Sequence, residues 1–351
     1  MRHQLRTVTL LCCLQSVLTC ACFPQQTGGT NAPTSGGRVL KIDELTWTDI
    51  DALNRDTSLF LLTVGMLEEH GPHLPVGADT IGVEHEAGQV ADRLSRALPG
   101  WNVVVMPTIN YGSSGANQIG NVAVHPGTYG IRLSTLRSLI ADVGGQIAQN
   151  GFKWVFVLNG HGAPTHHAAA NDACDFVSEV FKATMLNVSS LFSADAAIQA
   201  KGASIAARHF SAADLSSFGR DVHAGLVETS AVLAVRPDLV RSIYRNLPSL
   251  RAESLQDSRD LAMKPGWPGY FSSPSRANAA YGRDVEAWWV EGMSDLILQA
   301  VRGENLFGRP RWPEPVQNDP AYAQLVDEIL APEREFEQEL ERWLGQRRAS
   351  N

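Results

Sequence analysis

The stretch from Leu59 to Thr80 reads LFLLTVGMLEEHGPHLPVGADT. Its first seven residues are almost continuously apolar, which is typical of a strand buried on both faces of a parallel sheet. Carboxylate and imidazole side chains follow this run closely. Open α/β sheets place their binding sites at the carboxyl ends of strands. The stretch therefore predicts a buried strand with a functional site at its end.

The turning loop after this strand carries three candidate metal ligands. Glu68 and His70 are two residues apart, so their side chains point the same way from an extended backbone. Asp79 can fold back over them because glycines and prolines bend the intervening residues 71–77. Carboxylates and imidazoles together are typical ligands of a metal ion. The alternative is a solvated loop whose polarity has no function.

Two later stretches supply side chains of the same kind. Residues 154–158 predict another buried strand, and His161 follows it between two glycines that leave its ring open to a ligand. A structural hydrogen bond is the alternative role for this histidine. His223 precedes a predicted helix, and Glu228 lies in its first turns. For Glu228 the alternative is a favourable acid near a helix N-terminus.

The order of apolar runs predicts the fold class. Predicted strands are Leu59–Gly65, Asn102–Met106, Trp154–Leu158 and Ala183–Val188, and predicted helices are Val83–Leu98, Ile131–Ala148 and Thr165–Val180. Alternation of this kind predicts a three-layer αβα architecture of the α/β class, in which a mainly parallel central sheet has helices on both faces.

We place one folded domain at residues 39–310 and a C-terminal helical extension at residues 311–351. The extension is predicted as a charged helix from Asp319 to Arg348, interrupted or restarted near Pro332. Its charge density indicates a solvated surface element.

The first 38 residues predict export. Two arginines precede a short apolar run at residues 8–14, which indicates a signal peptide at residues 1–22 and not a membrane-spanning helix. Cys22 resembles a bacterial lipoprotein cleavage site, with Cys20 as the alternative. Residues 23–38 have the composition of a flexible linker. We expect a periplasmic or membrane-anchored lipoprotein that meets the membrane only through its lipid anchor, with free secretion as the alternative.

The composition of the chain limits the classes of partner that it can bind. The chain has 351 residues, with 37 acidic and 29 basic side chains, and its formal net charge is −8. An acidic chain without a basic cluster argues against nucleic acid as a partner. Only Cys174 lies outside the predicted signal region, so no intrachain disulfide is available to the folded part.

Several short motifs together resemble the creatininase (creatinine amidohydrolase) family over roughly Leu45 to Leu298. The motifs are Glu44-Leu45-Thr46-Trp47, the segment from Glu68 to Pro75, Gly77-Ala78-Asp79-Thr80, Tyr111-Gly112-Ser113-Ser114, Pro126-Gly127-Thr128, Asn159-Gly160-His161-Gly162 and the run from His223 to Ser230. Each motif is modest alone. Their number and their order carry the resemblance.

The resemblance implies a two-metal hydrolase site. Its ligands would be Glu68, His70, Asp79 and His161, with Asp79 bridging the two metal ions. Carboxylate and imidazole ligands without thiolates suit two divalent ions. We expect zinc, with manganese or iron as alternatives.

One further ligand departs from the creatininase pattern. Creatininase itself has a carboxylate two residues after the Gly-His histidine, and this chain has Ala163 there. Glu228 is then the natural candidate. His166 and His167 are the other candidates, unless they are ordinary polar residues in the first turn of a helix. The departure puts creatinine in doubt as the substrate, but not the metal site.

The implied chemistry is hydrolysis by a metal-activated water. The leaving nitrogen needs a proton donor, and His223 is our candidate because imidazole titrates near neutrality. Its alternative role is structural support. Trp267, Trp288 and Trp289 lie where the family closes its pocket, although core or interface packing is the simpler role for each.

We therefore expect a metal-dependent amidohydrolase that acts on a non-peptide C–N bond, in an amide or cyclic amide, of a small-molecule substrate. Hydrolysis of a formamide or a lactone is an alternative on the same site. A non-catalytic metal-binding or solute-binding lipoprotein is the alternative from another class. The family resemblance also implies a homo-oligomer.

Overall fold

The computed structural model describes residues 36–116, 119 and 125–349. The predicted signal peptide and residues 23–35 of the predicted linker lie outside this part of the chain. Strand β1 (Arg38–Lys41) begins at the last residue of that linker. Among the described residues, no helix combines the length and the apolar character needed to cross a bilayer.

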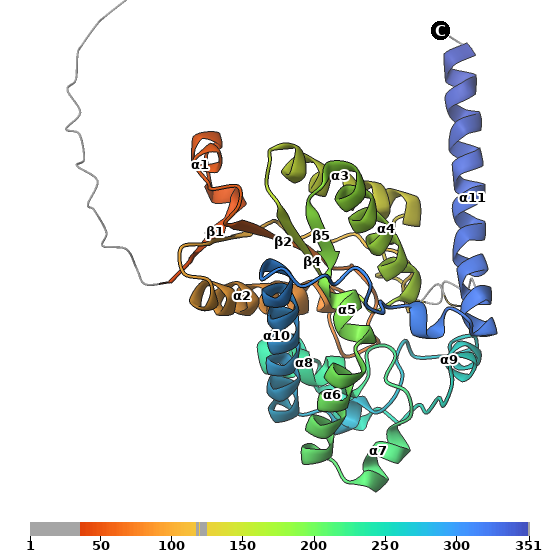
Figure 1. Ribbon diagram of the computed structural model, residues 1–351. Helices are drawn as coiled ribbons and strands as arrows, with labels where there is room; N and C mark the ends of the chain where they lie inside the picture. The colour runs from red at the N-terminus through yellow and green to blue at the C-terminus, as the bar shows by residue number, and fades with distance from the viewer. Residues whose placement is uncertain (1–35, 117–118, 120–124, 350–351) are drawn as a thin grey trace, which may run out of the picture. The chain divides into compact units, whose positions relative to one another are not determined.

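Five parallel strands form one sheet in the order β1-β3-β2-β4-β5, with β2 at its centre (Figure 1). The strands that follow β1 are β2 (Ser58–Val64), β3 (Asn102–Val105), β4 (Trp154–Asn159) and β5 (Thr184–Asn187). In β2, Leu59 pairs with Val103 on one side and with Trp154 on the other. The predicted α/β class and parallel sheet are confirmed. Strand β1 was not predicted, because it is short and largely exposed and lacks a continuous apolar run.

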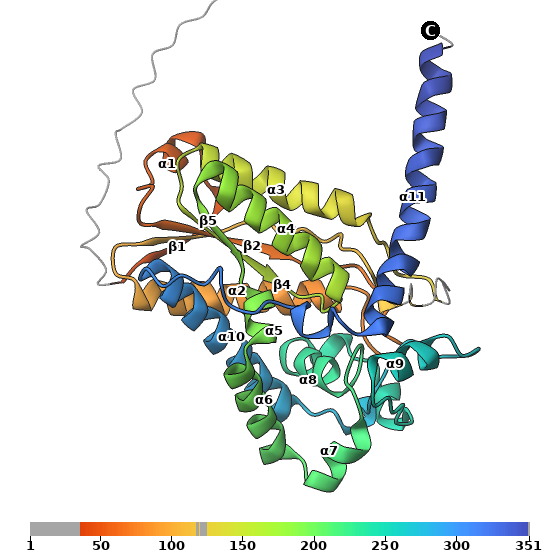
Figure 2. The same ribbon diagram turned by 45° about the vertical axis from the view of Figure 1, so that its right-hand side comes forward.

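Alternate residues of β2 face two different cores, because successive side chains of a strand point to opposite faces. Leu59 and Leu61 belong to the core under α2 and α10, whereas Phe60 and Leu62 belong to the core under α3 and α4. These helices are α2 (Ala78–Ala97), α3 (Leu133–Gln149), α4 (Pro164–Phe181) and α10 (Ala279–Val301). Figure 2 shows α3 and α4 on one face of the sheet and α2 and α10 on the other, so the predicted three layers are confirmed.

Shorter helices complete the fold, and in Figure 1 the first of them lies above β1 whereas the others lie below the sheet. They are α1 (Trp47–Asp51), α5 (Val188–Ala194), α6 (Ala196–His209), α7 (Ala212–Phe218), α8 (Leu226–Val235) and α9 (Leu255–Ala262), with 3-10 turns at Ile42–Glu44, Pro237–Leu239, Ser242–Asn246, Pro274–Arg276 and Glu314–Val316. Helix α8 touches α10 at Gly282, where a Cβ atom would lie 1.9 Å from the carbonyl oxygen of Ser230. This backbone contact fixes α8 beside the sheet and its functional residues.

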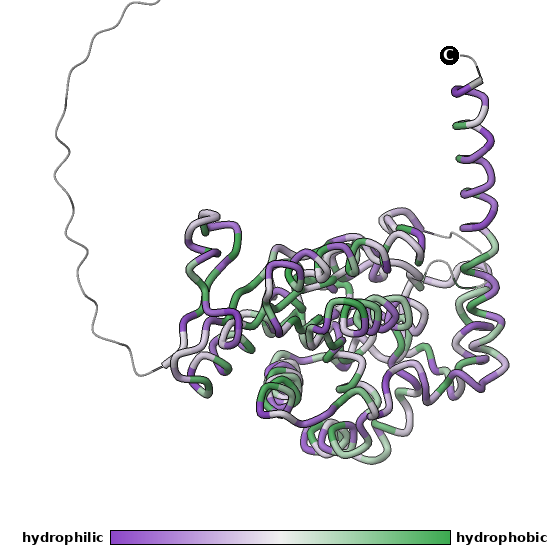
Figure 3. Tube along the Cα trace, turned by 45° about the horizontal axis from the view of Figure 1, so that its top comes forward, coloured by the Kyte–Doolittle hydropathy of each residue, from purple (hydrophilic) through white to green (hydrophobic). Residues whose placement is uncertain are grey.

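Helix α11 runs without interruption from Pro320 to Ala349, so the expected break near Pro332 is wrong. An interior proline removes one helical hydrogen bond, but the helix is held on both sides of it. Glu328 pairs with Arg259 before the proline, and Glu333 accepts a hydrogen bond from the backbone N–H of Leu133 at 2.7 Å after it. The outer part of α11 is mostly hydrophilic in Figure 3 and exposed, as expected of a surface element.

Candidate metal site

The loop after β2 folds back on itself and returns Asp79 to the end of the strand. The backbone N–H of Glu68 donates to the carbonyl of Val76 at 2.8 Å, which closes the loop. Asp79 then lies in the first turn of α2, where the helix dipole favours a negative charge. Glu68 and His70 are buried beside it.

Three of the predicted ligands gather around the fourth, Asp79. Its Oδ1 lies 3.2 Å from Nε2 of His70, and its Oδ2 lies 3.1 Å from Nδ1 of His161. The same Nδ1 of His161 lies 3.0 Å from Oε2 of Glu68. The two oxygens of Asp79 therefore face two different imidazoles, which is the arrangement a bridging carboxylate requires.

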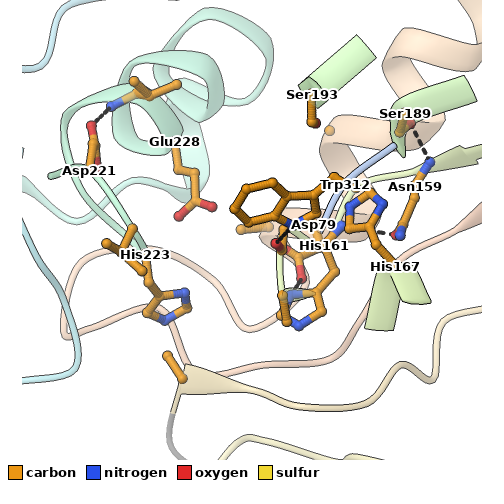
Figure 4. Close-up of a pocket in the computed structure, with 18 of the residues that line it drawn as sticks. Asp79, Asn159, His161, His167, Ser189, Ser193, Asp221, His223, Glu228 and Trp312 are labelled. Carbon is orange, nitrogen blue, oxygen red and sulfur yellow. Dashed lines mark hydrogen bonds and ion pairs between the residues drawn. The ribbon is translucent and has the colours of Figure 1, made fainter. Parts of the chain in front are cut away.

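Glu228 and His223 approach this centre from α8 and the turn before it (Figure 4). Oε2 of Glu228 lies 3.7 Å from Nε2 of His70, and Nδ1 of His223 lies 3.6 Å from Oε1 of Glu68. Glu228 also accepts a hydrogen bond from the backbone N–H of Ala224, as an acid at a helix start does.

Three groups of possible ligand atoms result, each with its atoms within 4.8 Å of one another. The groups are Glu68–His70–His223, Glu68–Asp79–His161 and His70–Asp79–Glu228. Because Glu68, His70 and Asp79 each occur in two groups, the site is one continuous cluster.

The donor atoms of this cluster fit a metal cation. Nδ1 of His70 lies 3.0 Å from the carbonyl of Glu68 and donates to it, which leaves a lone pair on Nε2 facing Asp79. Among the described residues, Nε2 of His70, Oε2 of Glu68 and Oδ2 of Asp79 have no hydrogen-bond partner. Buried acceptors that face only one another are unfavourable unless a cation or a proton lies among them.

The charges of the cluster depend on one another. Burial raises the pKa of Asp79, but His70 and His161 outweigh it and hold that pKa well below its usual value. Burial lowers the pKa of His70, and the negative charge of Asp79 more than compensates and raises it to about 10. Burial raises the pKa of the half-buried Glu228 to about 7, against the charge of His70. The acids thus need positive charge beside them to stay ionised.

His166 and His167 lie in the first turn of α4, directly after Ala163, and both are buried. Nδ1 of His166 accepts from the backbone N–H of Ser113 at 3.2 Å, and Nδ1 of His167 lies 3.4 Å from Nδ2 of Asn187. Within the part of the chain that the structure describes, neither histidine joins a group of three ligand atoms. Glu228 does, so the geometry favours it over the two histidines.

Backbone groups that the motifs did not reveal position these side chains. The carbonyl of Glu69 lies 2.7 Å from Nε2 of His223 and accepts from it, so Nδ1 of His223 carries the lone pair toward Glu68. The backbone N–H of Ala116 donates to Oε1 of Glu68. Every residue except proline has a backbone N–H, so the residue type at position 116 gave no sign that Ala116 is the donor.

A cavity of about 630 Å³ opens beside the cluster. Its size is ordinary for a small-molecule site. Trp288, Trp289 and Trp312 line it together with Asp79, His161, His223 and Glu228. Trp267 instead packs against Phe271 in a separate core cluster.

The parallel sheet, the covering helices and a buried carboxylate–imidazole cluster beside a cavity define an α/β protein with a candidate metal centre. The profile of the creatininase family, described as creatinine amidohydrolase, matches residues 43–297. The chain belongs to this family of hydrolases. The resemblance expected from Leu45 to Leu298 is confirmed over nearly the same residues.

Two curated relatives and one solved structure illustrate the range of the family. The chain is 29% identical over 281 residues to the mycofactocin precursor peptide peptidase of Mycobacterium ulcerans (strain Agy99), which covers 76% of this chain and 95% of that protein. It is 26% identical over 267 residues to the creatinine amidohydrolase of Pseudomonas putida, covering 74% and 96%. The structure named Creatininase Mn has a TM-score of 0.56 at 24% identity, covering 75% and 99%, and shows the shared fold.

Proposed function

We propose that this protein is a metal-dependent hydrolase that cleaves an amide or cyclic amide C–N bond. The observation that carries this proposal is the position of Asp79, whose two carboxylate oxygens face His70 at 3.2 Å and His161 at 3.1 Å. A carboxylate between two imidazoles could serve as a ligand of two cations. The family membership supports hydrolysis as the reaction class.

Each side chain of the cluster has a distinct task in this proposal. Glu68, Asp79 and His161 would hold one divalent ion, and His70, Asp79 and Glu228 would hold a second. Bound zinc, or manganese or iron in its place, would polarise the substrate carbonyl and lower the pKa of a water molecule. The structure named Creatininase Mn is consistent with such ions in the family.

His223 moves the proton in this proposal. Its Nε2–H is committed to the carbonyl of Glu69, and its Nδ1 faces Glu68 inside the cluster. A neutral imidazole held in one tautomer can accept a proton at Nδ1 and return it to the leaving nitrogen. His223 also belongs to a group of possible ligands with Glu68 and His70, so direct metal ligation by His223 is the competing role.

The substrate that we propose is a small molecule with a non-peptide C–N bond. A peptide bond is a second candidate, because the relatives include proteins named mycofactocin precursor peptide peptidase. Formamide and lactone hydrolysis use the same metals and the same proton shuttle. A non-catalytic lipoprotein that only binds metal or solute is the remaining alternative, and turnover of any of these substrates would exclude it.

We further propose that the protein is exported, carries a lipid at Cys22 and forms a homo-oligomer. The apolar run at residues 8–14, followed by small residues and Cys22, supports export. The homo-oligomer rests on the family resemblance alone.

Metal analysis of the purified protein, followed by a hydrolysis screen, tests the proposal. We expect two divalent ions per chain in the wild type and loss of bound metal and turnover in Asp79→Asn. Asp92→Asn is the matched control, because Asp92 is an exposed acid on the same helix. A wild-type protein that binds no divalent metal, or an Asp79→Asn variant with full metal content and activity, would overturn the proposal.

A further inference from the structure

Two buried glutamates outside the candidate metal site line the same cavity. Glu86 on α2 is 7% exposed and Glu286 on α10 is 6% exposed, and we call them the acid pair. Both lie on the wall of the cavity that contains Asp79 and His161. Among the described residues, neither belongs to a group of three possible metal ligands.

One member of the acid pair, Glu286, lacks a hydrogen-bond partner in the described part of the chain. Neither carboxylate oxygen of Glu286 has a hydrogen-bond partner there. Burial raises the pKa of Glu86 to about 8. Burial and the charge of Glu86 raise the pKa of Glu286 to about 9. Buried carboxylates in this state need either a proton or a cation from outside the protein.

Helix geometry sets the distance from the acid pair to the metal ligands. Asp79 and Glu86 are seven residues apart and lie on one face of α2, about 10.5 Å apart along its axis. Residues 81–83 between them also line the cavity. On α10, Trp289 and Met293 lie one and two turns beyond Glu286 and line the same space. The cavity therefore extends from the metal ligands to the acid pair.

The surroundings of the acid pair favour an organic cation over a metal ion. No third His, Cys, Asp or Glu ligand joins the pair within the described residues, although metal ions in proteins usually take more than two protein ligands. Trp288 and Trp289 line the cavity, and aromatic rings attract guanidinium and ammonium groups. Two carboxylates match the several N–H donors of a guanidinium.

We propose that Glu86 and Glu286 bind a guanidinium or ammonium group of the substrate, about 10 Å from the carbonyl that reacts beside Asp79. This inference rests on the proposed hydrolase function, because it takes the metal ligands as the place of reaction. The spacing equals about three residues of extended peptide, or one long basic side chain with its backbone. The substrate class is thus a basic amide, whether or not its C–N bond belongs to a peptide.

Two pairs of matched probes test this inference by calorimetric binding to the metal-loaded protein. The first pair is a hexanohydroxamate with a terminal guanidinium and the isosteric compound with a terminal urea, whose hydroxamate binds metal. The second pair, hexylguanidinium and hexylurea, has no metal-binding head. We expect the wild type to prefer the guanidinium member of each pair by about tenfold or more, as a charge-assisted hydrogen bond gives.

Variants test whether Glu86 and Glu286 cause the preference for the guanidinium probes. In Glu86→Gln/Glu286→Gln the guanidinium preference should fall to within about twofold, while the affinity for the urea-tailed hydroxamate stays unchanged. Glu84→Gln is the matched control, because Glu84 is an exposed acid on α2, and it should keep the full preference. A thermal melt establishes that the double variant is folded.

The outcomes separate the two proposals. If the wild type binds guanidinium and urea tails equally, the acid pair only shares a proton and the inference is wrong. If the double variant keeps the full preference, other groups bind the cation and the inference is also wrong. If the hydroxamates bind no better than the headless probes, the metal site fails, whereas hexylguanidinium against hexylurea still reports on the acid pair. Equal binding of the two tails by the wild type overturns the inference even if the double variant does not fold.

Discussion

Nε2 of His70 lies 3.2 Å from Oδ1 of Asp79, and because Nδ1 contacts the carbonyl of Glu68, Nε2 is the nitrogen left for a metal ion or a proton. Two acceptors at this distance repel each other unless a cation or a proton lies between them. Removing a residue that only supports a metal ligand weakens metal binding by about 10- to 100-fold. Asp79→Asn should weaken metal binding by more than this, because Asp79 is itself a proposed ligand. Inductively coupled plasma mass spectrometry of the dialysed protein measures this. Unchanged metal content would contradict the assignment.

Glu228 should hold the second metal ion. We expect Glu228→Gln to retain the ion bound by Glu68, Asp79 and His161 and to lose the other, which a titration of the metal-free protein resolves as one tight site instead of two. His166→Ala serves as the comparison and should keep both ions if the protein folds. If Glu228→Gln binds two ions tightly and remains fully active, Glu228 is only a favourable acid at the start of α8.

Removal of the His223 imidazole separates its two possible roles. In His223→Gln we expect both metal ions to stay bound and kcat to fall by about 10²- to 10⁴-fold, as loss of a general acid–base group does. The amide side chain can still donate to the carbonyl of Glu69, which His223 contacts at 2.7 Å. A variant that loses one metal ion together with its activity would identify His223 as a ligand.

The acid pair should make the protein less stable as the pH rises. Burial holds the pKa of Glu86 at about 8 and that of Glu286 at about 9, against 4.5 for an unshifted glutamate. The native state thus binds more protons than the unfolded state above pH 4.5. The stability contribution of the neutral acids is complete below that pH and is lost as the pH rises through 8 to 9.

Melting temperatures of the wild type and Glu86→Gln/Glu286→Gln, in the same metal state, measure this effect. The wild type should lose several degrees more than the double variant between about pH 5 and about pH 9.5. Glu84→Gln should follow the wild type, because Glu84 is exposed. Parallel curves for the wild type and the double variant would show that the acid pair does not titrate in this range.

Fractionation of the producing bacterium tests the proposed location. With a lipid at Cys22 the wild type should pellet with the membranes, and Cys22→Ser should be released, because each buried methylene of an acyl chain contributes roughly 0.8 kcal/mol. Mass spectrometry of the N-terminus identifies the processing site. Two soluble proteins with the same processed N-terminus would indicate plain secretion, and an unprocessed N-terminus would refute export.

The sequence was informative where neighbouring residues share one environment. The run around Leu59 predicted a buried strand, and every residue of β2 is buried. Glu68 and His70 could be placed side by side because they are two residues apart in the loop after β2. The position of Glu228 was less certain, since it depends on how α8 packs against α10, a contact between residues about fifty positions apart.

Other features depend on long-range contacts that single segments do not encode. Strand β1 is short and exposed and joins the sheet through its pairing with β3. Glu86 carries a local signal, because it lies between Val83 and Val90 on the apolar face of α2, where an acid is unexpected. Its relation to Glu286 arises from the packing of two helices distant in sequence. Helix α11 continues through Pro332 because contacts with Arg259 and Leu133, both distant in sequence, hold it on either side of the proline.

The contact of α8 with α10 at Gly282 positions acids at both ends of the cavity, one in the candidate metal site and one in the acid pair. A methyl group there would meet the carbonyl oxygen of Ser230 at 1.9 Å and would have to push the helices apart by more than about 1 Å. Ser230 lies two residues after Glu228, and Gly282 lies one turn before Glu286. One carbon atom added at Gly282 would thus misalign Glu228 and Glu286, although the added atom contacts neither acid.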